Sequence, residues 1–85
     1  MRVVKEIINP GFRTTIFNWN NKYIIKLETS SFEQTYKIDQ FDLASDEEAV
    51  QLLDSEFTQQ IMTRFDQMAV DMTQALGRLS QGNGF

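Results

Sequence analysis

One long apolar stripe in the C-terminal part of the chain constrains the fold more than any other feature. Beyond Ser45, apolar side chains recur every three or four residues as far as Leu79. The stripe consists of Val50, Leu53, Phe57, Ile61, Phe65, Met68, Met72, Leu76 and Leu79. The mean spacing of about 3.6 residues is the period of an α-helix with one apolar face. The stripe therefore predicts a helix over 46–79 whose apolar face packs against another structural element.

The start of this helix is marked by residues that favour helix N-termini. Ser45 and Glu48 have the spacing of a capping box. The acidic residues at 46–48 lie where the helix dipole favours negative charge, which explains them without a metal ion. Asp54 and Ser55 could begin a second helix. Because the stripe passes through them without a change of phase, we expect one continuous helix instead.

The first forty residues have the pattern of β-structure. Runs of β-branched and aromatic residues predict strands over 2–8, 12–18, 22–28 and 32–39. The connections between them are short and rich in turn-forming residues, so neighbouring strands must be antiparallel. The predicted fold is therefore α+β: a four-stranded antiparallel meander followed by one long C-terminal helix packed on one sheet face.

The strand registers decide which side chains reach the core. Between the third and fourth strands we expect Leu27 opposite Phe32, which also places Lys26 opposite Glu33 as an ion pair. The inner face of the third strand then carries Tyr23, Ile25 and Leu27. This arrangement places every charged residue of these two strands on the outer face.

The loop at Asn20-Asn21 leaves two registers open, because a change of one residue turns a strand over. A three-residue loop puts Phe17 in the core, and we favour it because it buries the larger ring. A two-residue loop buries Phe12 and Ile16 instead. It turns Phe17 and Trp19 outward, beside the lysines of the third strand.

The composition excludes most kinds of chemistry. The 85 residues include no cysteine and no histidine, so the chain lacks thiolates, imidazole bases and the commonest metal ligands. We predict no enzyme, no catalytic residues, no metal and no cofactor. The longest apolar runs are far too short to cross a membrane, and the N-terminus does not resemble a signal peptide, so we expect a cytoplasmic protein without membrane partners. The expected organisation is one domain over 1–79, with the sheet in 1–40, the helix in 45–79 and a flexible tail at 80–85.

The length of the helix predicts a second subunit. A helix over 46–79 would be about 51 Å long, whereas a seven-residue strand spans about 23 Å. About half of the helix must then project beyond its own sheet with its apolar face uncovered. We predict a homodimer whose interface consists of Phe65, Met68, Met72, Leu76 and Leu79. The alternative is a monomer in which a kinked helix folds back over the sheet.

A second hypothesis concerns the outer face of the sheet. Residues 1–40 carry six basic and four acidic side chains, whereas 41–85 carry two and eight, which gives the net charge of −4. Basic side chains bind phosphates and aromatic rings stack on bases. The candidate nucleic-acid-binding residues are Arg13, Trp19, Lys22, Lys26 and Lys37. The order of elements resembles that of dimeric PUR-type single-strand binders, a resemblance of topology without a shared motif.

Of the two hypotheses, we favour a small non-enzymatic interaction or regulatory module that acts as a homodimer. Its further partner would be another protein. Binding of single-stranded nucleic acid to the basic, aromatic sheet face is the alternative.

Overall fold

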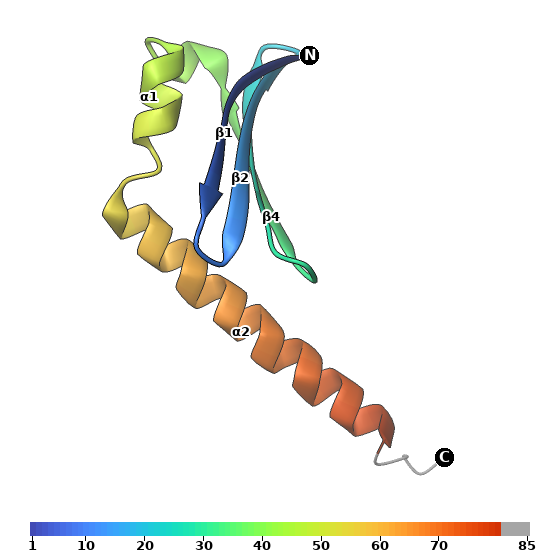
Figure 1. The fold of residues 1–85 in the computed structure, drawn as a ribbon. Coiled ribbons are helices and arrows are strands. Elements are labelled where there is room, and N and C mark those ends of the chain that lie inside the picture. The colour runs from blue at the N-terminus through green and yellow to red at the C-terminus, as the bar shows by residue number, and fades with distance from the viewer. Residues whose placement is uncertain (81–85) are drawn as a thin grey trace.

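The computed structural model describes residues 1–80, which form one four-stranded sheet followed by helices (Figure 1). The strands are β1 (Arg2–Asn9), β2 (Phe12–Trp19), β3 (Lys22–Glu28) and β4 (Glu33–Asp39). They lie in the order β1-β2-β3-β4, each antiparallel to its neighbour. A 3-10 turn η1 (Gln40–Asp42) leads to helices α1 (Asp46–Gln51) and α2 (Ser55–Ser80). The predicted α+β meander is confirmed. The tail expected at 80–85 lies outside the described residues except for Ser80, which ends α2.

The predicted continuous helix is wrong, because the chain leaves helical geometry between α1 and α2. The backbone N–H of Leu53 donates to the carbonyl of Val50 at 3.0 Å, which closes the end of α1 in a tight turn. A new N-cap follows: the Asp54 carboxylate accepts from the N–H of Phe57 at 2.8 Å. Aspartate stabilises such a helix start more than a helix interior, so the break falls where Asp54 stands.

The predicted start of the first helix is confirmed. The Ser45 hydroxyl accepts from the N–H of Glu48 at 3.3 Å, and Ser45 itself is extended. In return, the Glu48 carboxylate accepts from the N–H of Ala44 at 2.8 Å. Two N–H groups at this helix end are thereby satisfied by side chains.

The favoured three-residue loop between β2 and β3 is wrong, and the two-residue alternative is correct. Trp19 lies opposite Lys22, and both residues of the turn have positive φ, 55° at Asn20 and 64° at Asn21. These are the angles of a type I′ turn, whose twist matches that of the strands and which asparagine tolerates. As a result, Ile16 is fully buried on the inner face.

The predicted register between β3 and β4 is wrong by two residues. Leu27 lies opposite Gln34, and the loop spans four residues, 29–32. Thr29 closes this loop, because its hydroxyl accepts from the N–H of Phe32 at 2.9 Å. A shift of two residues leaves each side chain on its predicted face.

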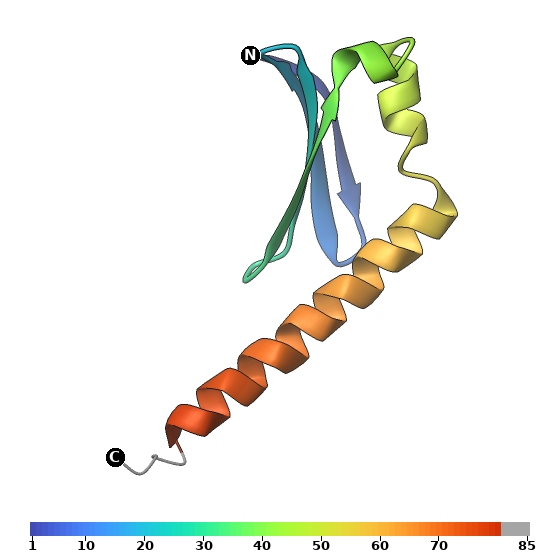
Figure 2. The ribbon, with the colours of Figure 1, turned by 180° about the vertical axis from the view of Figure 1, so that it is seen from behind.

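The core lies between the inner face of the sheet, α1 and the N-terminal half of α2. Its buried apolar residues are Phe12, Ile16, Tyr23, Ile25, Leu27, Ala49, Ile61 and Phe65. Figures 1 and 2 show α1 beside the sheet, whereas α2 crosses the end of the sheet near the β1–β2 turn and continues beyond it. The Cα radius of gyration is 16.3 Å, compared with about 12 Å for a compact domain of this length. The C-terminal half of α2 accounts for this elongation.

Candidate interaction surfaces

A polar network, buried at Gln34 and exposed at Arg64, fixes α2 against β4. The Gln34 side-chain amide donates to the carbonyl of Ile61 at 3.0 Å, and its oxygen accepts from the Tyr36 hydroxyl at 2.8 Å. The Arg64 guanidinium in turn donates to the Tyr36 hydroxyl at 3.1 Å. The Tyr36 ring also packs edge-on against Phe57, with 5.3 Å between ring centroids. The direction in which α2 leaves the sheet is therefore set by specific bonds as well as by apolar packing.

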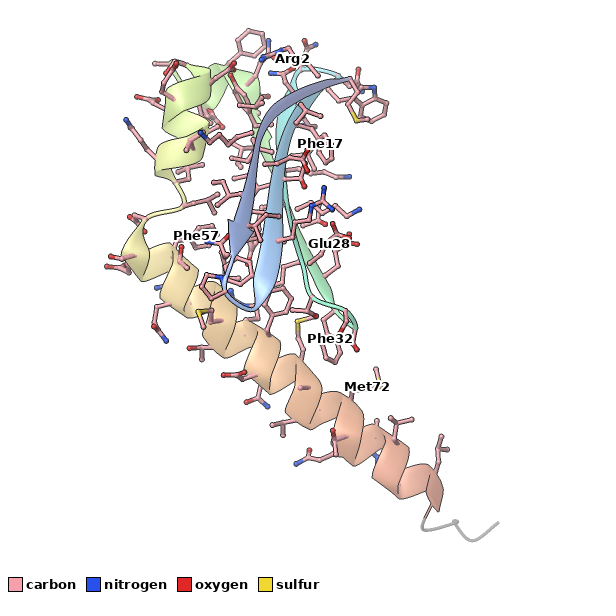
Figure 3. The ribbon with its side chains drawn as sticks, viewed as in Figure 1. Arg2, Phe17, Glu28, Phe32, Phe57 and Met72 are labelled. Atoms are coloured by element: carbon pink, nitrogen blue, oxygen red, sulfur yellow. The ribbon has the colours of Figure 1, made fainter. Side chains whose placement is uncertain are left out.

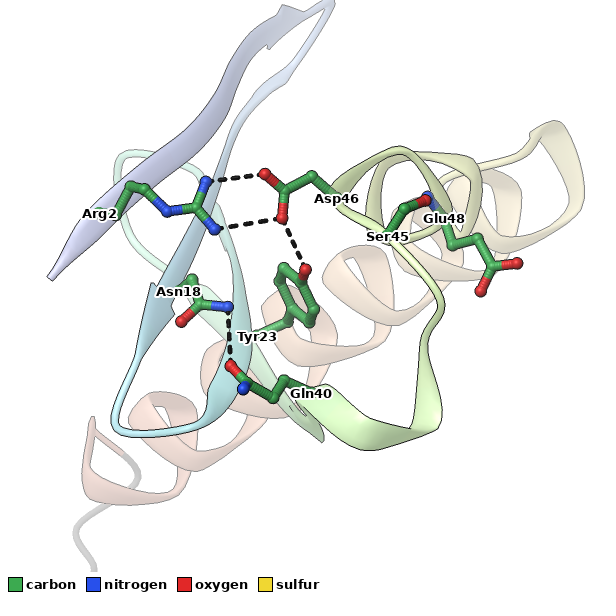
Figure 4. A network of polar contacts seen from close by, with 7 residues as sticks. All are labelled: Arg2, Asn18, Tyr23, Gln40, Ser45, Asp46 and Glu48. Carbon is green, nitrogen blue, oxygen red and sulfur yellow. Dashed lines mark hydrogen bonds and ion pairs between the residues drawn. The ribbon is translucent and has the colours of Figure 1, made fainter.

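A second network holds α1 against the opposite end of the sheet (Figure 4). Arg2 of β1 donates to both Asp46 carboxylate oxygens, at 2.7 and 3.2 Å, and the Tyr23 hydroxyl donates to one of them at 2.6 Å. The hydrogen bond from Arg2, followed by that from Tyr23, lowers the pKa of Asp46 to about 2. The same carboxylate raises the pKa of Tyr23. Asp46 thus joins α1 to the sheet, a role that its helix-start position alone does not reveal.

The apolar stripe of α2 changes from buried to exposed along the helix. Phe65, expected at the dimer interface, is buried within its own chain against Phe12, with 6.0 Å between ring centroids. Met68 is half-buried and packs on the same core. Beyond it the exposed fraction rises, from 49% at Met72 through 57% at Leu76 to 66% at Leu79. We call these last three residues the apolar overhang.

The overhang faces the same side as the part of α2 that carries the sheet. Met68, Met72, Leu76 and Leu79 follow one another at steps of four, four and three residues, so they share one helix face with Ile61 and Phe65. Figure 3 shows Met72 on this side of α2, just beyond Phe32 in the β3–β4 loop. The expected interface residues therefore lie on one face of α2, but only the C-terminal part of this face is accessible to a partner.

The outer sheet face collects all five candidate nucleic-acid-binding residues. By the observed registers, Arg13, Trp19, Lys22, Lys26 and Lys37 share the face away from the helices. Trp19 is 54% exposed and lies directly opposite Lys22. Figure 3 shows two further residues of this face, Phe17 and Glu28, on the side of the sheet away from α1.

Acidic side chains balance the positive charge of this face. Its four basic residues share it with Glu6, Glu28, Glu33 and Asp39. Arg13 forms an ion pair with Glu6, and Lys26 lies 3.7 Å from Glu28 and 3.8 Å from Glu33. Since phosphate binding depends on an excess of positive charge, this neutral face gives weak attraction for a nucleic acid.

An apolar row crosses the same face, and the sequence reasoning did not resolve it. Val3 lies opposite Phe17, and Phe17 lies opposite Ile24. Phe17 and Ile24 are half-buried, whereas Val3 is 53% exposed. The row depends on the two-residue turn at Asn20-Asn21, which was the alternative that we did not favour.

An apolar hollow lies where the break between α1 and α2 meets the sheet. It has a volume of about 220 Å³ and is lined by Ile25, Tyr36, Ile38, Leu52 and Phe57. Tyr36 supplies its one polar group, the hydroxyl, which is already bonded to Gln34 and Arg64. Within residues 1–80, no three carboxylate, cysteine or histidine side chains come together closely enough to hold a metal ion.

Comparison with protein-family models, with curated proteins and with solved structures found no match for this chain. In the described part of the chain, neither helix has the length and apolar character needed to span a membrane.

Proposed function

We propose that this protein is a non-enzymatic interaction module that works as a homodimer assembled through the apolar overhang of α2. The observation that carries the proposal is the continuity of one stripe across two environments. Its first half, Ile61 and Phe65, is buried by the chain's own sheet, and its second half continues in phase while its exposed fraction rises from 49% at Met72 to 66% at Leu79. An exposed extension of a core-forming stripe marks a surface for association.

The rigidity of α2 supports this role. The bonds from Gln34 and Arg64 join α2 to β4, and the helix is unbroken from there to Ser80, so the overhang has a defined direction from the sheet. A preorganised surface loses little conformational entropy on binding. A small chain without disulfides also gains stability from the additional core that a second copy supplies.

The margins of the overhang suit contact with protein better than contact with charged polymers. Thr73 lies beside the stripe with an uncharged hydroxyl, and the charged residues of this region, Asp66, Asp71 and Arg78, lie outside the stripe itself. Interface centres are depleted of charge in the same way. The net negative charge of the overhang region also disfavours nucleic acid as its ligand.

Sedimentation equilibrium over a wide range of concentrations tests the proposal. We expect the 9.9 kDa chain to sediment as a species of twice that mass at high concentration and to dissociate on dilution. A mass of one chain at every concentration would overturn the homodimer. In that case a fluorescent single strand, titrated at two salt concentrations, would test the alternative by quenching of Trp19.

A further inference from the structure

We infer that the two copies associate through antiparallel overhangs, with the two-fold axis beside Ala75. The inference rests on the proposed homodimer and goes further, because it specifies the partner surface and the register. The occupant of the overhang is the overhang of a second copy.

The position of the sheet excludes a parallel pair. The sheet lies on the apolar side of α2, over Ile61 and Phe65, and the overhang belongs to that same side. In a parallel pair the two apolar sides would face each other along their whole length. Both sheets would then have to occupy the space between helices whose axes are only about 8–10 Å apart. In an antiparallel pair each sheet lies beyond the end of the other helix, and no such clash arises.

The same geometry sets the register. Overlap must begin after Met68, which still packs on its own core, and α2 ends at Ser80. The midpoint of this stretch is close to Ala75, a small half-buried residue that allows the two helices to approach closely. With the axis there, Met72 packs between the partner's Leu76 and the partner's Leu79.

The charges beside the stripe fit this arrangement. Asp71 and Arg78 lie on one edge of the overhang, since seven residues make about two helical turns. Antiparallel pairing about Ala75 places Arg78 at nearly the same height as the partner's Asp71 and on the same edge. A parallel pair would bring Asp71 toward the edge that carries the partner's Asp66, where like charges repel. The charges beside the overhang are therefore complementary between two antiparallel copies and not between two parallel copies.

Disulfide trapping tests the register, because the chain contains no cysteine of its own. Single variants Ala75→Cys, Met72→Cys and Leu79→Cys are oxidised as full-length proteins, after circular dichroism has shown that each is folded. We expect Ala75→Cys to form a covalent dimer as its main product. Leu79→Cys alone should not, because antiparallel copies of this position are about 12 Å apart along the axis, beyond the span of a disulfide of about 7 Å. A mixture of Met72→Cys and Leu79→Cys should form the mixed disulfide, since these positions face each other.

The outcomes separate this inference from the proposed function. A dimer in sedimentation with efficient self-linkage at both Met72→Cys and Leu79→Cys would indicate parallel helices and overturn the inference alone. A dimer without any linkage at Ala75→Cys would show that the overhang meets another surface and would also overturn it. A chain that stays monomeric in sedimentation would overturn the proposed function and the antiparallel pair with it.

Discussion

Replacing Met72 by glutamate should dissociate the homodimer without unfolding the chain. About half of this side chain is already covered by its own chain, because its exposed fraction is 49%. Full burial of a methionine contributes about 1.5–3 kcal/mol, so covering the rest contributes about 1 kcal/mol per copy and about 2 kcal/mol per dimer. At 1.4 kcal/mol for each factor of ten, Met72→Glu should raise the dissociation constant at least about 30-fold. Burial of two carboxylates in an apolar contact increases the loss further.

The matched control is Gln74→Glu, which introduces the same charge on the opposite side of α2. Gln74 is exposed and lies two residues from Met72, about 200° around the helix. Glutamate has nearly the helix propensity of methionine and glutamine, so both variants should keep the wild-type melting curve of the folded chain. Sedimentation equilibrium gives the two dissociation constants. Equal dimerisation of Met72→Glu and wild type, or equal weakening by both variants, would refute the role of the overhang.

Three further outcomes follow from the networks and turns. Folding lowers the pKa of Asp46 from 3.8 to about 2, so its carboxyl group binds a proton less readily in the folded chain than in the unfolded chain. The stabilisation that Asp46 gives should therefore be complete above about pH 4 and fall as the pH drops toward 2. Urea titrations at several pH values should show this dependence, and Asp46→Asn should flatten it. Gln34→Leu should lower the free energy of unfolding by about 1–3 kcal/mol, because the buried carbonyl of Ile61 and the Tyr36 hydroxyl both lose a partner; an unchanged denaturation midpoint would contradict the network. Asn21→Gly should stabilise the fold by a few tenths to about 1 kcal/mol, since glycine adopts a φ of 64° without strain, and a lower melting temperature would contradict the type I′ turn.

Much of the candidate surface could be predicted from the period of the apolar residues. The stripe and the length of the helical segment together indicated that Met72, Leu76 and Leu79 lie beyond the sheet, and all three are exposed. The same reasoning placed Phe65 at the interface, yet it lies in the core. Periodicity shows which face of a helix is apolar, but the tertiary fold decides how far along that face the sheet extends.

Two of the errors share one physical cause. A helix break at Asp54 changes the direction of the chain but leaves the spacing of its apolar residues intact, so the stripe contained no signal of it. A register shift of two residues between β3 and β4 likewise preserves which side chains share a face. The sequence correctly placed the basic residues on the outer face of the sheet. How far acidic side chains neutralise them depends on which residues are neighbours across the strands.

By itself, the sequence determined the four strands followed by helical structure, the antiparallel meander, the capped start at Ser45 and the apolar face of α2, because each depends on local spacing and short connections. The tertiary structure alone decided the turn at Asn20-Asn21, the direction of α2 and the point at which its stripe becomes exposed. These features depend on competition between distant partners, such as Gln34 for the backbone of Ile61. The local sequence pattern is compatible with more than one form of each of these features, and only the packing of the chain selects the form that is observed.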